Sequence, residues 1–242
     1  MPLKTFELET IGQFTVVKNK TNRNIRLSLS PEGDIRISIP YWAPYKTGID
    51  FADSKSDWIL KNSKKPNPII NGQAIGKMHV IYFIPSLSGA DTIRTRVNNG
   101  KIIINYPRNL DISEKTVQAK AKSAAIRALK LEAEAILTER LTELAHLYDL
   151  RISRLRIKKL QSRWGSCDTK HVITLNLYLV QLPYDLIDYV ILHELAHTKH
   201  LNHSQNFWTF LEEISPEAKK LRKRLKTFRA GVIYNAIELA SI

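Results

Sequence analysis

The sequence holds one cysteine, Cys167, and two methionines in 242 residues. A single cysteine excludes an internal disulfide framework, so the expected compartment is the cytoplasm. No apolar run approaches the ~20 residues that span a bilayer, and residues 1–14 contain neither a long apolar segment nor a small-residue cleavage site. We therefore expect no membrane partner and no secretion signal.

Acidic residues are scarce relative to basic ones. The chain has 37 Lys and Arg against 23 Asp and Glu, a net charge of +14 and a pI of about 9.8. Such a field favours anionic partners, among them nucleic acid and nucleotides, without choosing between them. The densest basic segment is "KKLRKRLKTFR", Lys219 to Arg229. It is either a solvated helical face or a contact for nucleic acid or a nucleotide.

Glycine and proline are both absent from residues 113–150, which are rich in Ala, Leu, Glu and Lys. This composition predicts a long helix, or two in succession. Before it, apolar and polar residues alternate over 13–19, 25–40, 78–85 and 101–107, which predicts strands, while residues 48–65 have helical spacing. No internal repeat is evident. The apolar fraction of 43% suffices for a core without help from a metal.

The second half mixes both element types. Residues 154–159 and 171–180 alternate as strands do, with a loop predicted at 161–170. Helices are predicted from Pro183 to His200, over 205–214 and from 215 to 228. The sequence thus predicts an α+β fold, with a β-rich N-terminal part over 1–106 and a second, α+β domain over 107–242.

Four of the seven histidines lie in the stretch "HELAHTKHLNH", His193 to His203. His193 and His197 are four apart on a predicted helix, so both imidazoles project from one face. Paired imidazoles suit Zn²⁺. Glu194 lies about 100° further round the helix, beside the metal rather than on it. This is the HExxH arrangement of two ligands and a general base.

A catalytic zinc takes three protein ligands and keeps one position open. His203 is the natural third ligand, because the helix ends before it and the chain can reverse; His200 is the less suitable candidate. One zinc ion is expected, with other divalent metals (Mn²⁺, Co²⁺, Ni²⁺) left open. Water activated by the metal, with Glu194 as the general base, makes metal-assisted hydrolysis the predicted reaction class.

The motifs "SRWGSC" and "HELAHTKHLNHSQNFW" resemble those of the YgjP-like metal-dependent hydrolases. These are zincin-like proteins related to the WLM and SprT-type metallopeptidases. "RNIRLSLSPEGDIRISIP" and "DWILK" are similar to the opening hairpin and helix of the family, so the resemblance spans most of the chain. A metzincin is disfavoured, because His200 replaces the metzincin glycine and Met1 and Met78 cannot supply a methionine turn.

The resemblance implies a zincin-like domain with His193, His197 and His203 as ligands and Glu194 as base. It also implies that the loop 161–170 faces the site. Arg163 then stabilises developing negative charge, binds an anionic group of the substrate or ties down the loop, and Trp164 either packs or stacks on substrate. Cys167 is expected to be an apolar filler rather than a ligand. The strand at 171–180 is where zincins offer an edge to a peptide, with Asn176 and Tyr178 as exposed candidates for substrate binding.

The sequence predicts three functions, which we give in order of preference. The first is a zinc-dependent metallopeptidase that acts on a peptide or protein substrate. The second is a metal-dependent hydrolase of nucleotides or other phosphate esters, which the positive charge would suit. The third is a basic zinc-binding module that recruits nucleic acid through Lys219 to Arg229.

Overall fold

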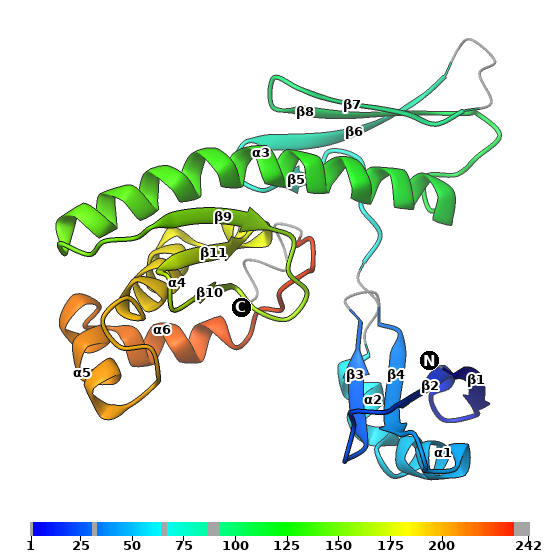
Figure 1. The fold of residues 1–242 in the computed structure, drawn as a ribbon. Coiled ribbons are helices and arrows are strands. Elements are labelled where there is room, and N and C mark those ends of the chain that lie inside the picture. The colour runs from blue at the N-terminus through cyan, green and yellow to red at the C-terminus, as the bar shows by residue number, and fades with distance from the viewer. Residues whose placement is uncertain (1, 31–32, 64–66, 87–91, 235–242) are drawn as a thin grey trace. The chain divides into compact units, whose positions relative to one another are not determined.

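The structure is a computed structural model that describes residues 2–30, 33–63, 67–86 and 92–234 (Figure 1). The chain divides into two compact units, Met1–Asn67 and Pro68–Ile242. Strands dominate up to Tyr106 and helices afterwards, so the predicted α+β class is confirmed. The boundary expected at residue 106 falls inside the second unit.

The first unit is a four-stranded sheet with two helices. Its strands are β1 (Leu3–Leu8), β2 (Gly12–Asn19), β3 (Arg26–Leu29) and β4 (Ile35–Pro40), in the order β1-β2-β4-β3. The helical segment expected at 48–65 is divided into α1 (Tyr45–Ser54) and α2 (Ser56–Asn62). Gly48 lets α1 approach the sheet closely, since a Cβ there would lie 2.7 Å from Val16 Cγ1.

The second unit begins with a sheet of the same topology. Its strands are β5 (Ala74–Ile75), β6 (His79–Pro85), β7 (Arg94–Asn98) and β8 (Lys101–Tyr106), in the order β5-β6-β8-β7. In both sheets the second and fourth strands pair in parallel, and the paired residues are 21 positions apart, as in Phe14↔Ile35 and Val80↔Lys101. The sheet topology therefore repeats although the sequence shows no repeat.

A single helix, α3 (Lys115–Leu147), runs along the second unit. It packs against the sheet β5–β8 and also against the elements that follow it, as Figure 1 shows. Five of its buried residues are alanines, which lack side-chain bulk and allow close approach. The predicted long helix is thus confirmed as one element.

A three-stranded sheet follows α3. Its strands are β9 (Arg154–Lys158), β10 (Gly165–Cys167) and β11 (Val172–Asn176), in the order β10-β11-β9. The strand predicted over 171–180 is too long, because residues Leu177–Gln181 form the 3₁₀ helix η1. All five η1 residues are buried, and an apolar run buried on every side loses the alternation that would identify its conformation.

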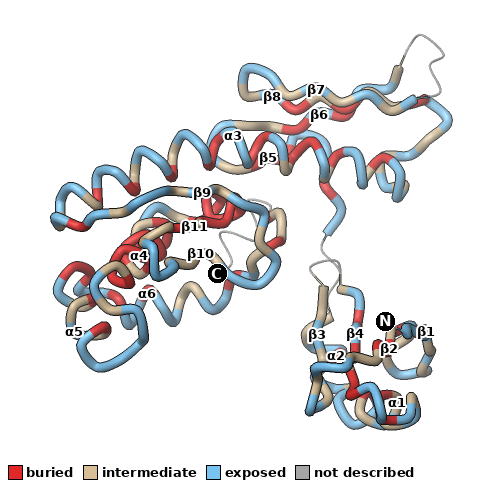
Figure 2. The backbone as a smooth tube through the Cα atoms, in the orientation of Figure 1, coloured by how far each residue is buried: buried red, intermediate tan, exposed pale blue. Residues whose placement is uncertain are grey.

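Three helices complete the unit: α4 (Tyr184–Ala196), α5 (Gln205–Ile214) and α6 (Ala218–Leu225). Figure 2 shows that α4 is buried along most of its length. Its exposed residues, Tyr184 and Asp185, lie on the first turn. Both α5 and α6 pack against α4. None of the described helices is long and apolar enough to cross a membrane.

Candidate metal centre

Helix α4 carries the first two histidines of the motif and holds them inside the unit. Three of its apolar residues, Ile187, Val190 and Ile191, are at most 3% exposed. The helix therefore belongs to the core, and the polar residues of its last turn are fixed by packing. His197 is the C-cap residue of α4, so the helix ends there rather than at His200 as predicted.

Three imidazoles converge at the end of this helix. His193, His197 and His203 each offer a ligand atom within 4.8 Å of the others. The Nε2 atoms of His193 and His203 are 3.1 Å apart. The reversal expected after His197 is therefore present, and it brings His203 back to the cluster. His200 does not join it; its ring contacts Phe210 instead, at 5.9 Å between centroids.

Aromatic side chains of α5 support the cluster. Phe207 is fully buried, and its ring centroid lies 5.0, 4.5 and 4.8 Å from the rings of His193, His197 and His203. Trp208 stacks on His203 at 5.5 Å. Phe207 and Trp208 thus pack α5 against the ligand histidines, and these contacts fix the orientation of the imidazoles.

The hydrogen bond of His197 selects its tautomer. His197 Nδ1 lies 3.0 Å from the carbonyl oxygen of His200, which can only accept. Nδ1 therefore carries the proton and Nε2 keeps a free lone pair. A backbone carbonyl on the outer nitrogen is the arrangement that orients metal-binding histidines in proteins.

Burial keeps the two helix histidines neutral. Desolvation, followed by the neighbouring His197, His203 and Arg222, lowers the pKa of His193 to about 3. Burial also lowers the pKa of His197. At neutral pH both rings are uncharged, the form that binds a metal.

The carboxylate of Glu194 is buried between α4 and β10. Burial raises its pKa to about 8, and Arg163 opposes this rise. Its Oε2 atom is buried without a hydrogen-bond partner among the described residues, as is Nδ1 of His193. Gly165 of β10 makes room for the carboxylate, because a Cβ there would lie 2.7–2.9 Å from its atoms.

These residues fit a divalent ion. Two nitrogens bound to tetrahedral zinc at ~2.0–2.1 Å are ~3.3 Å apart, close to the 3.1 Å between His193 and His203. The cluster consists of three imidazoles with a carboxylate beside it. Cys167 is not in the group, and burial raises the pKa of its thiol to about 11, which disfavours the thiolate that a metal would need.

Asn176 and Tyr178 are not exposed, and this expectation was wrong. Both side chains are 0% exposed. The Asn176 amide instead holds the loop before β10: Nδ2 donates to the carbonyls of Leu160 and Arg163, at 3.0 and 2.8 Å, and Oδ1 accepts from the backbone of Leu160. It anchors the loop on which Arg163 and Trp164 reside.

The sheet edge beside the centre is β10 and not β11. The segment expected to present the edge contains β11, which pairs with β10 on one side and with β9 on the other, so it is the central strand. Strand β10 lies in the segment 161–170, which was predicted to be all loop. Gly165 on β10 touches Glu194, which places this edge directly against the centre.

A cavity of about 350 Å³ adjoins the cluster at His193. His193, Glu194, Arg163 and Trp164 are among its walls, so the loop residues expected to face the site do line it. Trp164 also packs against the core, so packing and cavity lining are both present. Its remaining walls are Gly165 and residues of α4, α6 and the segment after α6: Tyr189, Val190, Arg222, Leu225, Lys226 and Phe228.

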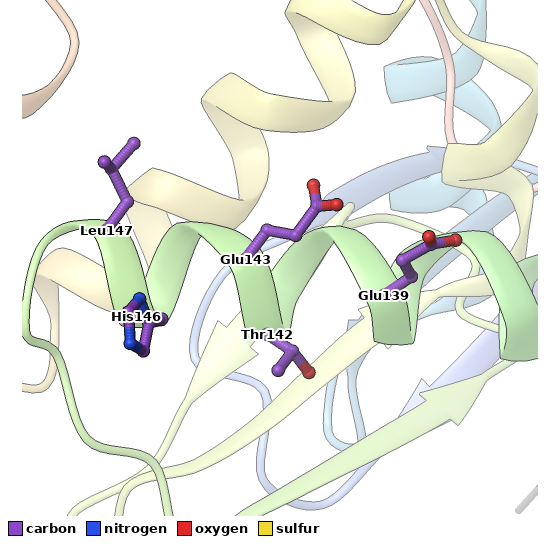
Figure 3. A pocket seen from close by; sticks show the side chains of 5 residues that line it. All are labelled: Glu139, Thr142, Glu143, His146 and Leu147. Atoms are coloured by element: carbon purple, nitrogen blue, oxygen red, sulfur yellow. The ribbon is translucent and has the colours of Figure 1, made fainter.

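A second hollow lies along α3, away from the histidine cluster. Figure 3 shows its five lining side chains, all of which come from that one helix: Glu139, Thr142, Glu143, His146 and Leu147. Glu143 is already paired with Arg140 at 2.7 Å. No second element closes this hollow in the part of the chain described, and its residues form no metal-binding group.

Comparison with known proteins identifies the family of the chain. The model of the YgjP-like metallopeptidase domain matches residues 23–228, which is most of the chain. The chain belongs to the YgjP-like family. It is therefore a metal-dependent hydrolase of a peptidase family, as predicted, and the family implies a divalent metal and a peptide or protein substrate. The comparisons do not support a nucleic-acid partner.

Two solved structures are similar to parts of this YgjP-like chain. One is the metallopeptidase zymogen abylysin of Pyrococcus abyssi, 25% identical, with a TM-score of 0.36, covering 40% of this chain and 99% of that one. The other is the zymogen jannalysin of Methanocaldococcus jannaschii, 25% identical, with a TM-score of 0.34, covering 37% and 93%. No curated protein matches the chain.

Proposed function

We propose that the chain is a zinc peptidase in which His193, His197 and His203 hold one zinc ion and Glu194 is the general base. The observation that carries the proposal is the convergence of three imidazoles within 4.8 Å beside a buried carboxylate. Imidazole also suits other divalent ions, so metal analysis decides which one is used.

The chain's own residues account for binding and proton transfer. When bound, zinc would supply Lewis acidity, which polarises a carbonyl and lowers the pKa of water. Glu194 takes a proton from the attacking water at its carboxylate and passes it to the leaving amine nitrogen. Arg163 favours the ionised carboxylate, since its charge opposes the rise in the pKa of Glu194. Gly165 leaves the space that the carboxylate occupies.

The edge strand β10 supports an extended substrate. A peptide that adds to a sheet edge is held by backbone hydrogen bonds and is positioned independently of its sequence. Strand β10 is an edge of its sheet and touches Glu194 through Gly165. A substrate strand paired with β10 therefore passes beside the three imidazoles.

The test combines metal content with hydrolysis by the full chain. We expect Glu194→Gln to keep its metal and lose about 10²–10⁴-fold in peptide hydrolysis, the usual contribution of a general base. His203→Ala should lose more than about 100-fold in metal affinity, because even changes to residues behind the ligands cost 10–100-fold. His200→Ala is the matched control, since its ring lies outside the cluster while its carbonyl still accepts from His197.

Two results would contradict the proposal. A Glu194→Gln variant as active as the parent would remove the general base. Turnover of a phosphate ester without cleavage of an unfolded protein would replace the substrate class.

A further inference from the structure

The cavity beside the imidazoles has an excess of positive side chains. Arg163, Arg222 and Lys226 line it, and Glu194 is the one carboxylate among its lining residues. We call it the cationic cavity. Neither Arg222 nor Lys226 forms an ion pair with a residue in the described ranges, so both charges can act on a ligand, whereas Arg163 acts on the Glu194 carboxylate.

Three neighbouring cations of the same basic segment are already paired. Lys219 lies 2.9 Å from a carboxylate oxygen of Glu212, and Lys220 lies 3.1 Å from one of Glu217. Arg224 pairs with Asp185 at the start of α4. The segment Lys219 to Arg229 is thus not a uniform basic face. Some of its cations are balanced by nearby carboxylates, while Arg222 and Lys226, four residues apart, turn to the cavity.

Arg222 is held beside the imidazole cluster. Its guanidinium carbon lies 4.5 Å above the centre of the Trp208 ring, a cation–π contact, and Trp208 in turn stacks on His203. This stack places a positive charge at a fixed position next to the proposed reaction centre. Arginine also presents its donors in a fork that matches a carboxylate.

The inner walls of the cationic cavity are apolar. Val190, Leu225 and Phe228 contribute to them, and all three belong to or pack against the core. At about 350 Å³ the cavity lies within the size range of ligand pockets. Apolar walls together with cationic side chains suit a ligand group that has an aliphatic stem and a terminal negative charge.

We infer that the cationic cavity binds a carboxylate of the peptide substrate through Arg222 and Lys226. This inference rests on the proposed peptidase function. The carboxylate is that of an aspartate or glutamate side chain or that of the substrate's C-terminus; both offer the same group, and the experiment separates them.

The first arm measures cleavage by the zinc-loaded full chain. One peptide set carries Glu or Gln at each position in turn, with an amidated C-terminus, and a second set compares free with amidated C-termini. We expect kcat/KM to be about tenfold higher for the carboxylate member of one pair, as contacts with two exposed cations allow. A preference in the first set identifies a side chain, and one in the second identifies the chain terminus.

Matched variants locate the source of that preference. Arg222→Gln with Lys226→Gln should reduce it to about twofold or less. Lys219→Gln with Lys220→Gln removes the same net charge from the same segment, and it should leave the preference intact. Equal cleavage within both peptide sets overturns the inference. Equal loss in both double variants also overturns it, because the preference would then come from the overall charge.

The second arm measures the affinity for peptides, which can be determined even if no peptide is cleaved. Fluorescently labelled peptides of the same pairs are titrated into the Glu194→Gln variant loaded with zinc. Tighter binding of the carboxylate member, lost in the Arg222 and Lys226 background, supports the cavity even if no peptide is cleaved. If the preference in binding is present but no peptide is cleaved, the result counts against the peptidase proposal alone. If the preference in binding is absent, the result counts against the cationic cavity.

Discussion

Replacing Glu194 by glutamine should stabilise the metal-free protein, and more so as the pH rises. The carboxylate is buried, one of its oxygens has no partner among the described residues, and its pKa is raised to about 8 from a usual value of 4.5. The folded state therefore holds a proton that the unfolded chain releases. A carboxyl group of this kind favours folding least at high pH, because the unfolded chain ionises freely while the folded one does not.

The size of the effect follows from the pKa values of the carboxyl group in the folded and unfolded chain. A tenfold difference between the two acid dissociation constants corresponds to about 1.4 kcal/mol. Relative to acidic pH, this group lowers the free energy of unfolding by about 1 kcal/mol at pH 5 and by about 4 kcal/mol at pH 8. Glutamine cannot ionise, so the stability gap between variant and parent should widen by about 3 kcal/mol between these pH values.

Urea denaturation with a chelator present measures this gap. Trp42 and Trp58 lie in the first unit and are exposed, so phenylalanine at both leaves Trp164 and Trp208 to report on the second unit. With a slope of about 2 kcal/mol/M, the widening corresponds to a shift of about 1.5 M in midpoint. Glu213→Gln, on the exposed side of α5, is the control and should not widen the gap. Parallel pH profiles for the parent and the Glu194 variant would refute the reasoning.

Two further substitutions test the support of the centre. Gly165→Ala should lower kcat by about 10–100-fold with metal content unchanged, because its Cβ displaces the Glu194 carboxylate; measured turnover equal to the parent would contradict this. Asn176→Ala should lower the free energy of unfolding by about 2–4 kcal/mol, since it leaves buried loop groups without partners; thermal unfolding measures this, and a loss below about 0.5 kcal/mol would contradict it.

The features that sequence predicted well are local ones. The helix at 205–214 was predicted to the residue, because a polar cap precedes an amphipathic pattern. The grouping of His193, His197 and His203 follows from spacing along one helix and a short reversal after it. Each depends on residues within about three helical turns, the range over which periodicity determines position.

The features that sequence missed depend on pairing between distant residues. Strand β9 pairs with β11 and makes β11 the central strand, so the edge beside the centre is β10. Strand β10 was hidden because a three-residue strand shows no alternation. The lack of carboxylate partners for Arg222 and Lys226 among the described residues could not be predicted either, since a run of basic residues does not reveal which of them have carboxylates nearby. For the role of Gly165 the sequence offered one local signal, which was the presence of a glycine at this position in a segment predicted to be loop.

At the metal centre, the groups that the proposed reaction requires lower the stability of the metal-free fold. His193 Nδ1 and Glu194 Oε2 are both buried without partners among the described residues, and each such group costs about 1–3 kcal/mol. The surrounding core tolerates them, because α4 is packed against α3, α5 and α6. A nearby divalent cation would favour the ionised carboxylate, since opposite charge lowers its pKa. The pH dependence expected for the metal-free chain should therefore weaken when zinc is added, and the carboxylate that destabilises the empty fold is the one that the proposed reaction requires.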